Sequence, residues 1–176
     1  MRGGWLVGEH LYACGCRNVA IITWSDEAFE WTSREAGFVQ ALEAHGVEVP
    51  HENRIKLSGA KPSRIEAAEL VGELLDSGLP FDGIFARSDR AASGVLQELR
   101  KRGISVPDRV KLVGYDDSIY SRLTTPGITT VNRSPAQLAR KGCEALLKLI
   151  AGEELPLETT VPVELVVRGS TVAGHG

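Results

Sequence analysis

The chain has 176 residues, 43% of them hydrophobic, and its 20 basic and 23 acidic side chains give a formal net charge of -3. A domain of about this length buries roughly 70% of its unfolded surface, so it needs neither a disulfide nor a metal for stability. The charges are spread along the chain without a basic stripe. This excludes nucleic-acid binding by the segment itself.

Cysteine usage and hydropathy indicate a cytoplasmic chain without membrane contact. Cys14, Cys16 and Cys143 are an odd number, and the first two are too close in sequence for an ordinary structural bridge. The pair Cys14-x-Cys16 has no partner ligand nearby in sequence, so we interpret it as small core residues and not as a metal or redox site. The chain start lacks the apolar core of a secretory signal, and no run approaches the ~20 apolar residues of a membrane helix.

Apolar periodicity predicts helices that alternate with short buried strands. We expect helices at residues 4–14, 33–45, 62–75, 91–102 and 134–150, and strands at 19–23, 55–57, 83–86, 110–115, 128–131 and 161–167. Strands separated by helical segments of ~10–15 residues favour right-handed βαβ units, so the fold class is α/β, a doubly wound parallel sheet in a layer sandwich. Pro126-Gly127, in the irregular stretch 118–133, marks a crossover.

Ligands of such sheets bind beyond the carboxyl ends of the strands, which places the candidate site just after Thr23, Ala86 and Tyr115. The sequence has no GxGxxG or GxxxxGK[ST] loop, and Asp26 and Glu27 in the turn after the first strand would repel a phosphate. It also lacks the GxSxG nucleophile elbow and any zinc-site spacing. We therefore expect no enzymatic activity, no cofactor and no metal.

Asp116 and Asp117 follow the predicted strand 110–115 and allow three interpretations. Adjacent carboxylates can split their pKa values and perform acid–base work, although adjacent side chains usually point different ways. In a second interpretation, one acid caps a turn while the other is solvated. In the third, Asp116 accepts hydrogen bonds from ligand hydroxyls at the end of its strand.

Five segments, in this order and spacing, resemble the lactose-repressor/galactose-repressor (LacI/GalR) family of transcriptional regulators. They are Arg34–Phe38 (REAGF), Phe85–Asp89 (FARSD), Val106–Asp117 (VPDRVKLVGYDD), Pro126–Val131 (PGITTV) and Glu164–Thr171 (ELVVRGST). Members of that family carry a helix-turn-helix head, which reads DNA, before a two-lobed domain of the periplasmic-binding-protein type I kind. A small effector, often a sugar, binds between the lobes. The resemblance thus implies an effector-sensing domain of a repressor-type regulator.

The resemblance also implies that the two-lobed domain is incomplete. Residues 1–126 match the carboxyl-side lobe, 127–152 match a crossover and a helix of the other lobe, and 153–176 match the return strand and a tail. We expect a fragment of a homodimer that contacts DNA only through an absent N-terminal head. The effector would change the angle between lobes and so the spacing of the heads. Apolar residues of helix 134–150 would then be uncovered.

Effector contacts carry over where the motifs match. Arg34 resembles the arginine that forks onto ligand hydroxyls or a carboxylate, and Asp116 resembles the acid that accepts hydrogen bonds from hydroxyls. Without the resemblance, Arg34 would be interpreted as a solvated residue at a helix start. Ser88 stands where members often carry an asparagine, and its single hydroxyl offers fewer hydrogen bonds than the amide of an asparagine. Asp89 is expected either to cap the next helix or to touch the ligand.

The aromatic part of the expected site departs from the family pattern. Pro135 matches a position where some members place an aromatic ring under the sugar. Trp24 or Trp31 would supply an aromatic face instead, or would wedge into an edge of the core. The principal alternative function is the sugar-binding protein of a transport system, which shares the fold, and the missing signal and the three cysteines count against it. An α/β enzyme has no motif in this sequence.

Overall fold

The computed structural model describes residues 1–24, 33–156 and 159–172, and its centre is a sheet of six strands in the order β2-β1-β3-β4-β5-β6. The first five strands run parallel, and β6 pairs antiparallel with β5 at one edge. The prediction of a doubly wound parallel sheet is confirmed, with one antiparallel edge strand. The strands are β1 (Val19–Trp24), β2 (Arg54–Leu57), β3 (Gly83–Ala86), β4 (Lys111–Tyr115), β5 (Thr129–Asn132) and β6 (Glu164–Val166).

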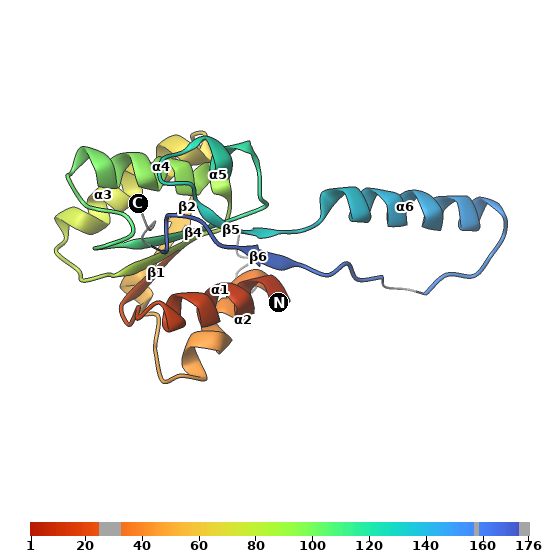
Figure 1. Cartoon of the computed structure of the whole chain (residues 1–176), viewed down its shortest axis with the longest axis horizontal. Helices are drawn as coiled ribbons and strands as arrows, with labels where there is room; N and C mark the ends of the chain where they lie inside the picture. Colours follow the sequence, from red (N-terminus) through yellow and green to blue (C-terminus); the bar gives the residue numbers. More distant parts are fainter. Residues whose placement is uncertain (25–32, 157–158, 173–176) are drawn as a thin grey trace.

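Helices cover both faces of this sheet (Figure 1). Helices α1 and α2 pack together on one face, and α3 and α4 pack together on the other, with α5 beside α4. A short 3-10 helix, η2, leads into β2. The helices are α1 (Arg2–Ala13), α2 (Ser33–Glu43), η2 (His51–Asn53), α3 (Ser63–Asp76), α4 (Asp89–Lys101), α5 (Ile119–Leu123) and α6 (Pro135–Ile150).

Each face of the sheet has its own apolar core. Along β1, Val19 and Ile21 face the core under α1 and α2, whereas Ala20 and Ile22 face the core under α3 and α4. Successive side chains of a strand point to opposite faces, so a central strand with both faces covered must be apolar throughout. This requirement explains the unbroken apolar run by which the sequence predicted β1.

Helix α1 begins at Arg2, two residues before the predicted start, because two glycines pack where no side chain fits. A Cβ added at Gly4 would lie 1.7 Å from the carbonyl oxygen of Arg34, and one at Gly3 would lie 2.2 Å from the hydroxyl of Tyr115. Glycine permits this approach of backbone to neighbouring elements. Apolar periodicity does not count glycines as core residues and therefore missed the first turn.

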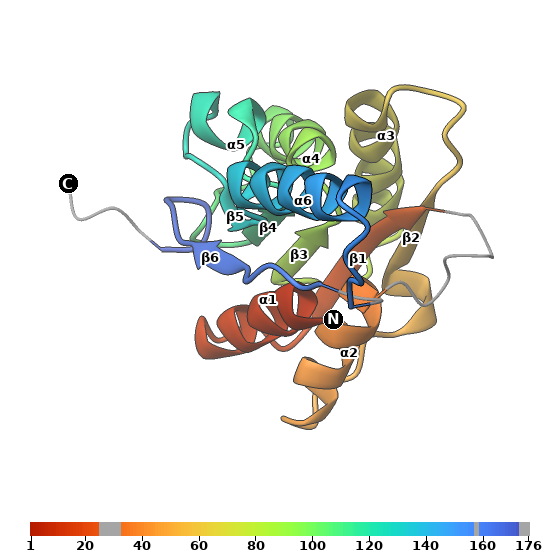
Figure 2. The ribbon, with the colours of Figure 1, turned by 90° about the vertical axis from the view of Figure 1, so that its right-hand side faces the viewer.

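Helix α6 and the segment that returns from it to β6 project away from the sheet (Figure 1), and Figure 2 views the helix from its side of the molecule. None of the residues of α6 is buried. As expected, apolar side chains are uncovered there, namely Leu138, Leu146, Leu147, Leu149 and Ile150. Strand β6 is shorter than the predicted 161–167, because only Glu164–Val166 pair with β5. Among the described residues, no helix has the length and hydrophobicity to cross a membrane.

Candidate functional site

The chain turns sharply at the end of β4 and so separates two adjacent carboxylates. Asp116 and Asp117 have φ values of 107° and 50°, which are uncommon for residues with a side chain. The N–H of Asp116 donates to the carbonyl of Val131 at 2.9 Å and so extends the pairing of β4 with β5. The two carboxylates then meet different arginines. This geometry argues against the paired-carboxylate interpretation.

The Asp116 carboxylate is largely enclosed and incompletely hydrogen-bonded. The Nε of Arg133 lies 2.8 Å from its Oδ1, at an ion-pair distance. This contact does not meet the geometry of a hydrogen bond, so within the described residues the buried Oδ1 has no hydrogen-bond donor. Burial raises the pKa of Asp116 above its ordinary value, although Arg133, Arg34 and Arg87 pull it down. Within the described residues, Asp116 therefore keeps an acceptor oxygen that no hydrogen bond satisfies.

Arg34 lies in the first turn of α2 and interacts electrostatically with Asp116. Its guanidinium carbon sits 4.0 Å from the centroid of the Tyr115 ring, within the range of a cation–π contact. Its Nη1 donates to the carbonyl of Arg87 at 3.3 Å. Burial lowers the pKa of Arg34, and Tyr115 and Asp116 act in the opposite direction. The solvated-arginine interpretation is wrong, because the ring and the carbonyl hold this side chain at the sheet edge.

Two arginines that sequence reasoning missed complete the group. Arg87 directly follows β3, and its Nε lies 3.7 Å from Oε1 of Glu35. The buried Glu35 also accepts a hydrogen bond from the hydroxyl of Thr23 in β1. Arg133 comes one residue after β5 and meets Asp116. Arg87 directly follows Ala86, a strand end that the sequence singles out, and Arg133 follows the end of β5, which the same rule would also have pointed to.

Asp117 is held entirely by the protein. Its Oδ1 accepts from Nη2 of Arg168 at 2.6 Å, and its Oδ2 accepts from Nη2 of Arg122 at 2.9 Å. Burial raises the pKa of Asp117, but the hydrogen bonds from the two arginines outweigh it and hold the pKa below its ordinary value. Since Arg122 belongs to α5 and Arg168 follows β6, Asp117 ties three segments together at the base of the site.

Ser88 takes the capping role that was one of the two expectations for Asp89. Ser88 is the N-cap of α4, and its hydroxyl accepts from the N–H of Ala91 at 3.2 Å. The cap expected at Asp89 is wrong, because Asp89 is the first residue of the helix and is fully buried. Its carboxylate accepts from the hydroxyl of Thr130 at 2.5 Å and from the N–H of Ser118 at 2.6 Å. Both oxygens of Asp89 are thus engaged beneath the Asp116 turn.

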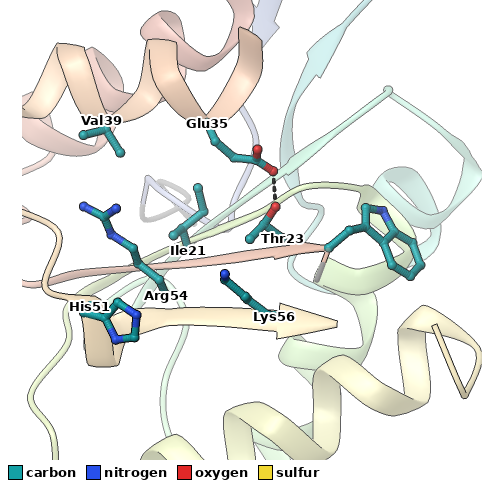
Figure 3. A pocket seen from close by; sticks show the side chains of 8 residues that line it. Ile21, Thr23, Glu35, Val39, His51, Arg54 and Lys56 are labelled. Carbon is teal, nitrogen blue, oxygen red and sulfur yellow. Dashed lines mark hydrogen bonds between the residues drawn. The ribbon is translucent and has the colours of Figure 1, made fainter. Parts of the chain in front are cut away.

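The expected aromatic residues lie at the margins of this group. Trp24 ends β1 with 37% of its surface exposed. It lines a cavity of about 280 Å³ between α2 and the edge of the sheet (Figure 3). Trp31 lies outside the described residues. Pro135 is exposed at the first position of α6. The lining residues of the cavity are Ile21, Thr23, Trp24, Glu35, Val39, His51, Arg54 and Lys56.

The three cysteines are free thiols: Cys16 is buried, Cys14 is half-buried and Cys143 is exposed. Cys16 is 1% exposed in the core under α1 and α2, and burial raises the pKa of its thiol to about 12. It is therefore a protonated core residue, as the sequence indicated. In the part of the chain that the structure describes, no group of His, Cys, Asp and Glu side chains could hold a metal ion. The sheet edge offers charges and hydrogen-bonding groups, which suit binding.

Comparison with known proteins defines the class of this fold. Residues 9–171 match the model of the periplasmic binding protein-like domain family. The HTH-type transcriptional regulator DegA of Bacillus subtilis is 33% identical over 97% of this chain and 50% of its own length. The HTH-type transcriptional regulator GntR of Pseudomonas aeruginosa is 32% identical over 97% of this chain and 49% of its own.

A solved structure gives the same result. A LacI family transcriptional regulator from Enterococcus faecium with bound ribose aligns with a TM-score of 0.83 at 29% identity, over 97% of this chain and 62% of that one. The chain belongs to the LacI/GalR family of transcriptional regulators, as the sequence motifs indicated. It spans about half the length of the curated relatives that it matches. These relatives are regulators and not enzymes.

The buried contacts of Asp117 predict a pH-dependent contribution to stability. Asp117→Asn should lower the free energy of unfolding by about 1–3 kcal/mol at neutral pH, because hydrogen bonds to a charged group are lost. The folded pKa is depressed, so this contribution is present above the ordinary pKa of an aspartate and is lost as the pH falls through the lower, folded pKa. Urea unfolding from pH 7 to pH 3 measures the difference between variant and wild type.

A matched control is Asp76→Asn, which breaks an ion pair with Arg102 on the surface. Exposed pairs contribute little, so this variant should unfold close to the wild type. Equal stability of Asp117→Asn and wild type at pH 7 would show that the Asp117 contacts do not hold the turn.

Proposed function

We propose that this chain is the effector-sensing domain of a LacI-type transcriptional regulator and that a small polar effector, such as a sugar, binds between Arg34 and Asp116. The observation that carries the proposal is the buried Oδ1 of Asp116, which lacks a hydrogen bond within the described residues and interacts electrostatically with the half-buried guanidinium of Arg34. A carboxylate that accepts from hydroxyls, opposite an arginine that donates, is suited to a polyhydroxylated ligand. The named relatives are regulators of transcription, which supports this role.

The other candidate residues receive supporting roles in this proposal. Asp89 has both oxygens engaged by the protein, so it fixes the turn that carries Asp116 and leaves ligand contact to others. Ser88 caps α4 with its oxygen and still has an O–H to donate toward the site. Trp24 would border the ligand from the end of β1. Pro135 would border it from the start of α6, just after β5.

We also propose that the effector acts by changing the arrangement of two lobes, of which residues 1–126 and 153–176 build one. Residues 127–152 would belong to the second lobe, and its remaining parts would cover the apolar side chains of α6. The change would move helix-turn-helix heads on DNA in a cytoplasmic homodimer. Since one lobe supplies only half of the contacts, this chain alone should bind an effector weakly.

The face formed by α3, α4 and α5 is the surface we propose for the homodimer. This face holds a groove lined in part by exposed apolar side chains. Ile119 has 63% of its surface exposed and Leu123 has 77%. Apolar groups gathered at one place on a soluble protein mark a contact with another protein. The Arg122–Asp117 hydrogen bonds join α5 to the residue beside Asp116, so the effector site and this face share one turn. The groove residues include Arg64, Ser93, Leu96, Gln97, Ile119, Tyr120 and Leu123.

Replacing Asp116 tests the proposed site. Asp116→Asn removes the charge but keeps the shape, and it should weaken effector binding roughly 10- to 100-fold, because a hydrogen bond to a charged group contributes about 1.5–3 kcal/mol. A thermal-shift screen of sugars, nucleobases and amino acids on the natural protein that contains this chain selects the ligand, and titration calorimetry then gives the affinities. Asp108→Asn, at an exposed position outside the site, should bind like the wild type. Unchanged affinity of Asp116→Asn would overturn the assignment.

Replacing Leu123 tests the dimer face. Leu123→Glu places a charge among the apolar residues of α5 and should convert the dimer of the natural protein into a monomer, since a buried unpaired charge is costly. Sedimentation velocity measures the change. Val172→Glu puts the same charge on an exposed aliphatic residue outside the groove, and it should remain dimeric. A dimer that survives Leu123→Glu would place the interface elsewhere.

A further inference from the structure

A cavity of about 280 Å³ lies between α2 and the edge strand β2 (Figure 3). Alternate residues of a strand share one face, so β1 and β2 both direct side chains toward α2. The strand residues that line the cavity in this way are Ile21, Thr23, Arg54 and Lys56. Glu35 and Val39 close it from the side of α2. Since small-molecule pockets usually measure about 300–1,000 Å³, this space suits a ligand of one or two rings.

The lining of the cavity changes from basic at one end to acidic at the other. Figure 3 shows His51 and Arg54 together at one end and the Thr23–Glu35 pair at the other. Ile21, which is buried, lies between them. A matching ligand has an anionic group at one end and an apolar middle. Its other end is neutral, because Glu35 would repel a second anion.

Contacts within the protein hold the polar groups of both ends in place. At the basic end, Nε of Arg54 donates to the carbonyl of Val49 at 3.1 Å. At the acidic end, the hydroxyl of Thr23 donates to the Glu35 carboxylate. Side chains that are fixed before binding lose less conformational entropy when a ligand arrives, so the cavity is preorganised.

An aromatic ring completes the lining. Trp24 directly follows Thr23 at the end of β1 and keeps 37% of its surface exposed. A Cβ added at Gly59 would lie 3.4 Å from the Trp24 ring, so this ring rests against backbone that carries no side chain. Aromatic rings attract one another in offset or edge-to-face arrangements. An exposed ring beside an apolar space therefore favours an aromatic ligand.

We infer that this cavity is a second small-molecule site and that it binds a small aromatic carboxylate. The carboxylate would face Arg54 and Lys56, since a guanidinium matches a carboxylate in shape and charge. The ring of the ligand would lie against Ile21 and meet the ring of Trp24. A hydroxyl or N–H at the far end of the ligand would be directed toward Glu35.

The inference goes beyond the proposed effector site. Neither Arg34 nor Asp116 lines the cavity, although Trp24, at the end of β1, would border both sites. A regulator with this cavity would therefore have places for two different small molecules.

Other classes of ligand fit the lining less well. A sugar would press hydroxyls against Ile21 and Val39, where a hydroxyl without a hydrogen bond costs free energy. A phosphate ester would bring nearly two negative charges into a space that also contains the Glu35 carboxylate.

Pairs of ligands that differ in one charge test the inference. Benzoate, 4-hydroxybenzoate and indole-3-acetate, each beside its neutral amide, are titrated into the natural protein that contains this chain, at constant ionic strength. We expect at least one acid to bind about ten times or more tightly than its amide, because the amide lacks the charge that Arg54 and Lys56 attract.

Variants of the lining identify the source of this preference. Arg54→Gln should lower the ratio of acid to amide affinity about tenfold, and Lys56→Gln, at an exposed position, should lower it about threefold. Trp24→Leu should weaken acid and amide alike by roughly two- to tenfold, the contribution of an aromatic pair. Arg109→Gln removes the same charge at an exposed position outside the cavity, and its ratio should equal that of the wild type.

Hydrogen–deuterium exchange locates the bound acid. The acid that binds most tightly should slow exchange of the backbone amides in segment 51–57 and leave segment 115–119 unchanged. Acids that bind no more tightly than their amides, a ratio unchanged in both Arg54→Gln and Lys56→Gln, or slower exchange in 115–119 without 51–57 would overturn the second site. The effector is selected in a separate screen, so none of these results decides the proposed function.

Discussion

Two consecutive residues in left-handed backbone conformations end β4, and the candidate site depends on this turn. A non-glycine residue with positive φ is strained by about 1 kcal/mol or more, so the surroundings must hold it in place. They do so from several sides. The N–H of Asp116 donates to Val131 and the N–H of Asp117 to the hydroxyl of Thr130, both in β5. The Asp117 carboxylate adds the contacts with Arg122 and Arg168.

The two adjacent aspartates of this turn, Asp116 and Asp117, have different roles. Both carboxylate oxygens of Asp117 accept hydrogen bonds from arginines, and these contacts make the turn rigid. Asp116 keeps a buried oxygen that has no hydrogen-bond donor in the described residues. Asp89 supports the same turn from below, and Gly114 makes room for it, since a Cβ there would lie 2.3 Å from the Asp89 carboxylate. Rigid support around one unsatisfied group is the arrangement expected of a preorganised binding site. The same hydrogen bonds reach α5, which gives the proposed effector a route to the proposed dimer face.

The sequence predicted the features that depend on local patterns. Unbroken apolar runs located β1, β3 and β4, and the alternation of strands with helices predicted the parallel sheet. The rule that ligands bind at the carboxyl ends of strands, with the family motifs, led to Asp116 and to Arg34, whose guanidinium lies over the ring of Tyr115, the residue before Asp116.

The features that the sequence did not predict depend on contacts between distant segments. Arg87 and Arg133 lie 46 residues apart in sequence numbering, and only the order of β3, β4 and β5 in the sheet brings both to Asp116. Asp89 is held by the hydroxyl of Thr130 and the N–H of Ser118, two partners that no local pattern reveals. The early start of α1 depends on the close approach of Gly4 to α2.

Hydrogen–deuterium exchange of the natural protein, with and without a saturating effector, tests most directly whether the ligand binds at the Asp116 turn. Binding between Arg34 and Asp116 predicts slower exchange of the backbone amides in segments 86–90 and 115–119, which carry Arg87 and the turn. Slower exchange confined to 51–57, along the cavity at the edge of β2, would contradict the assignment and place the effector there instead.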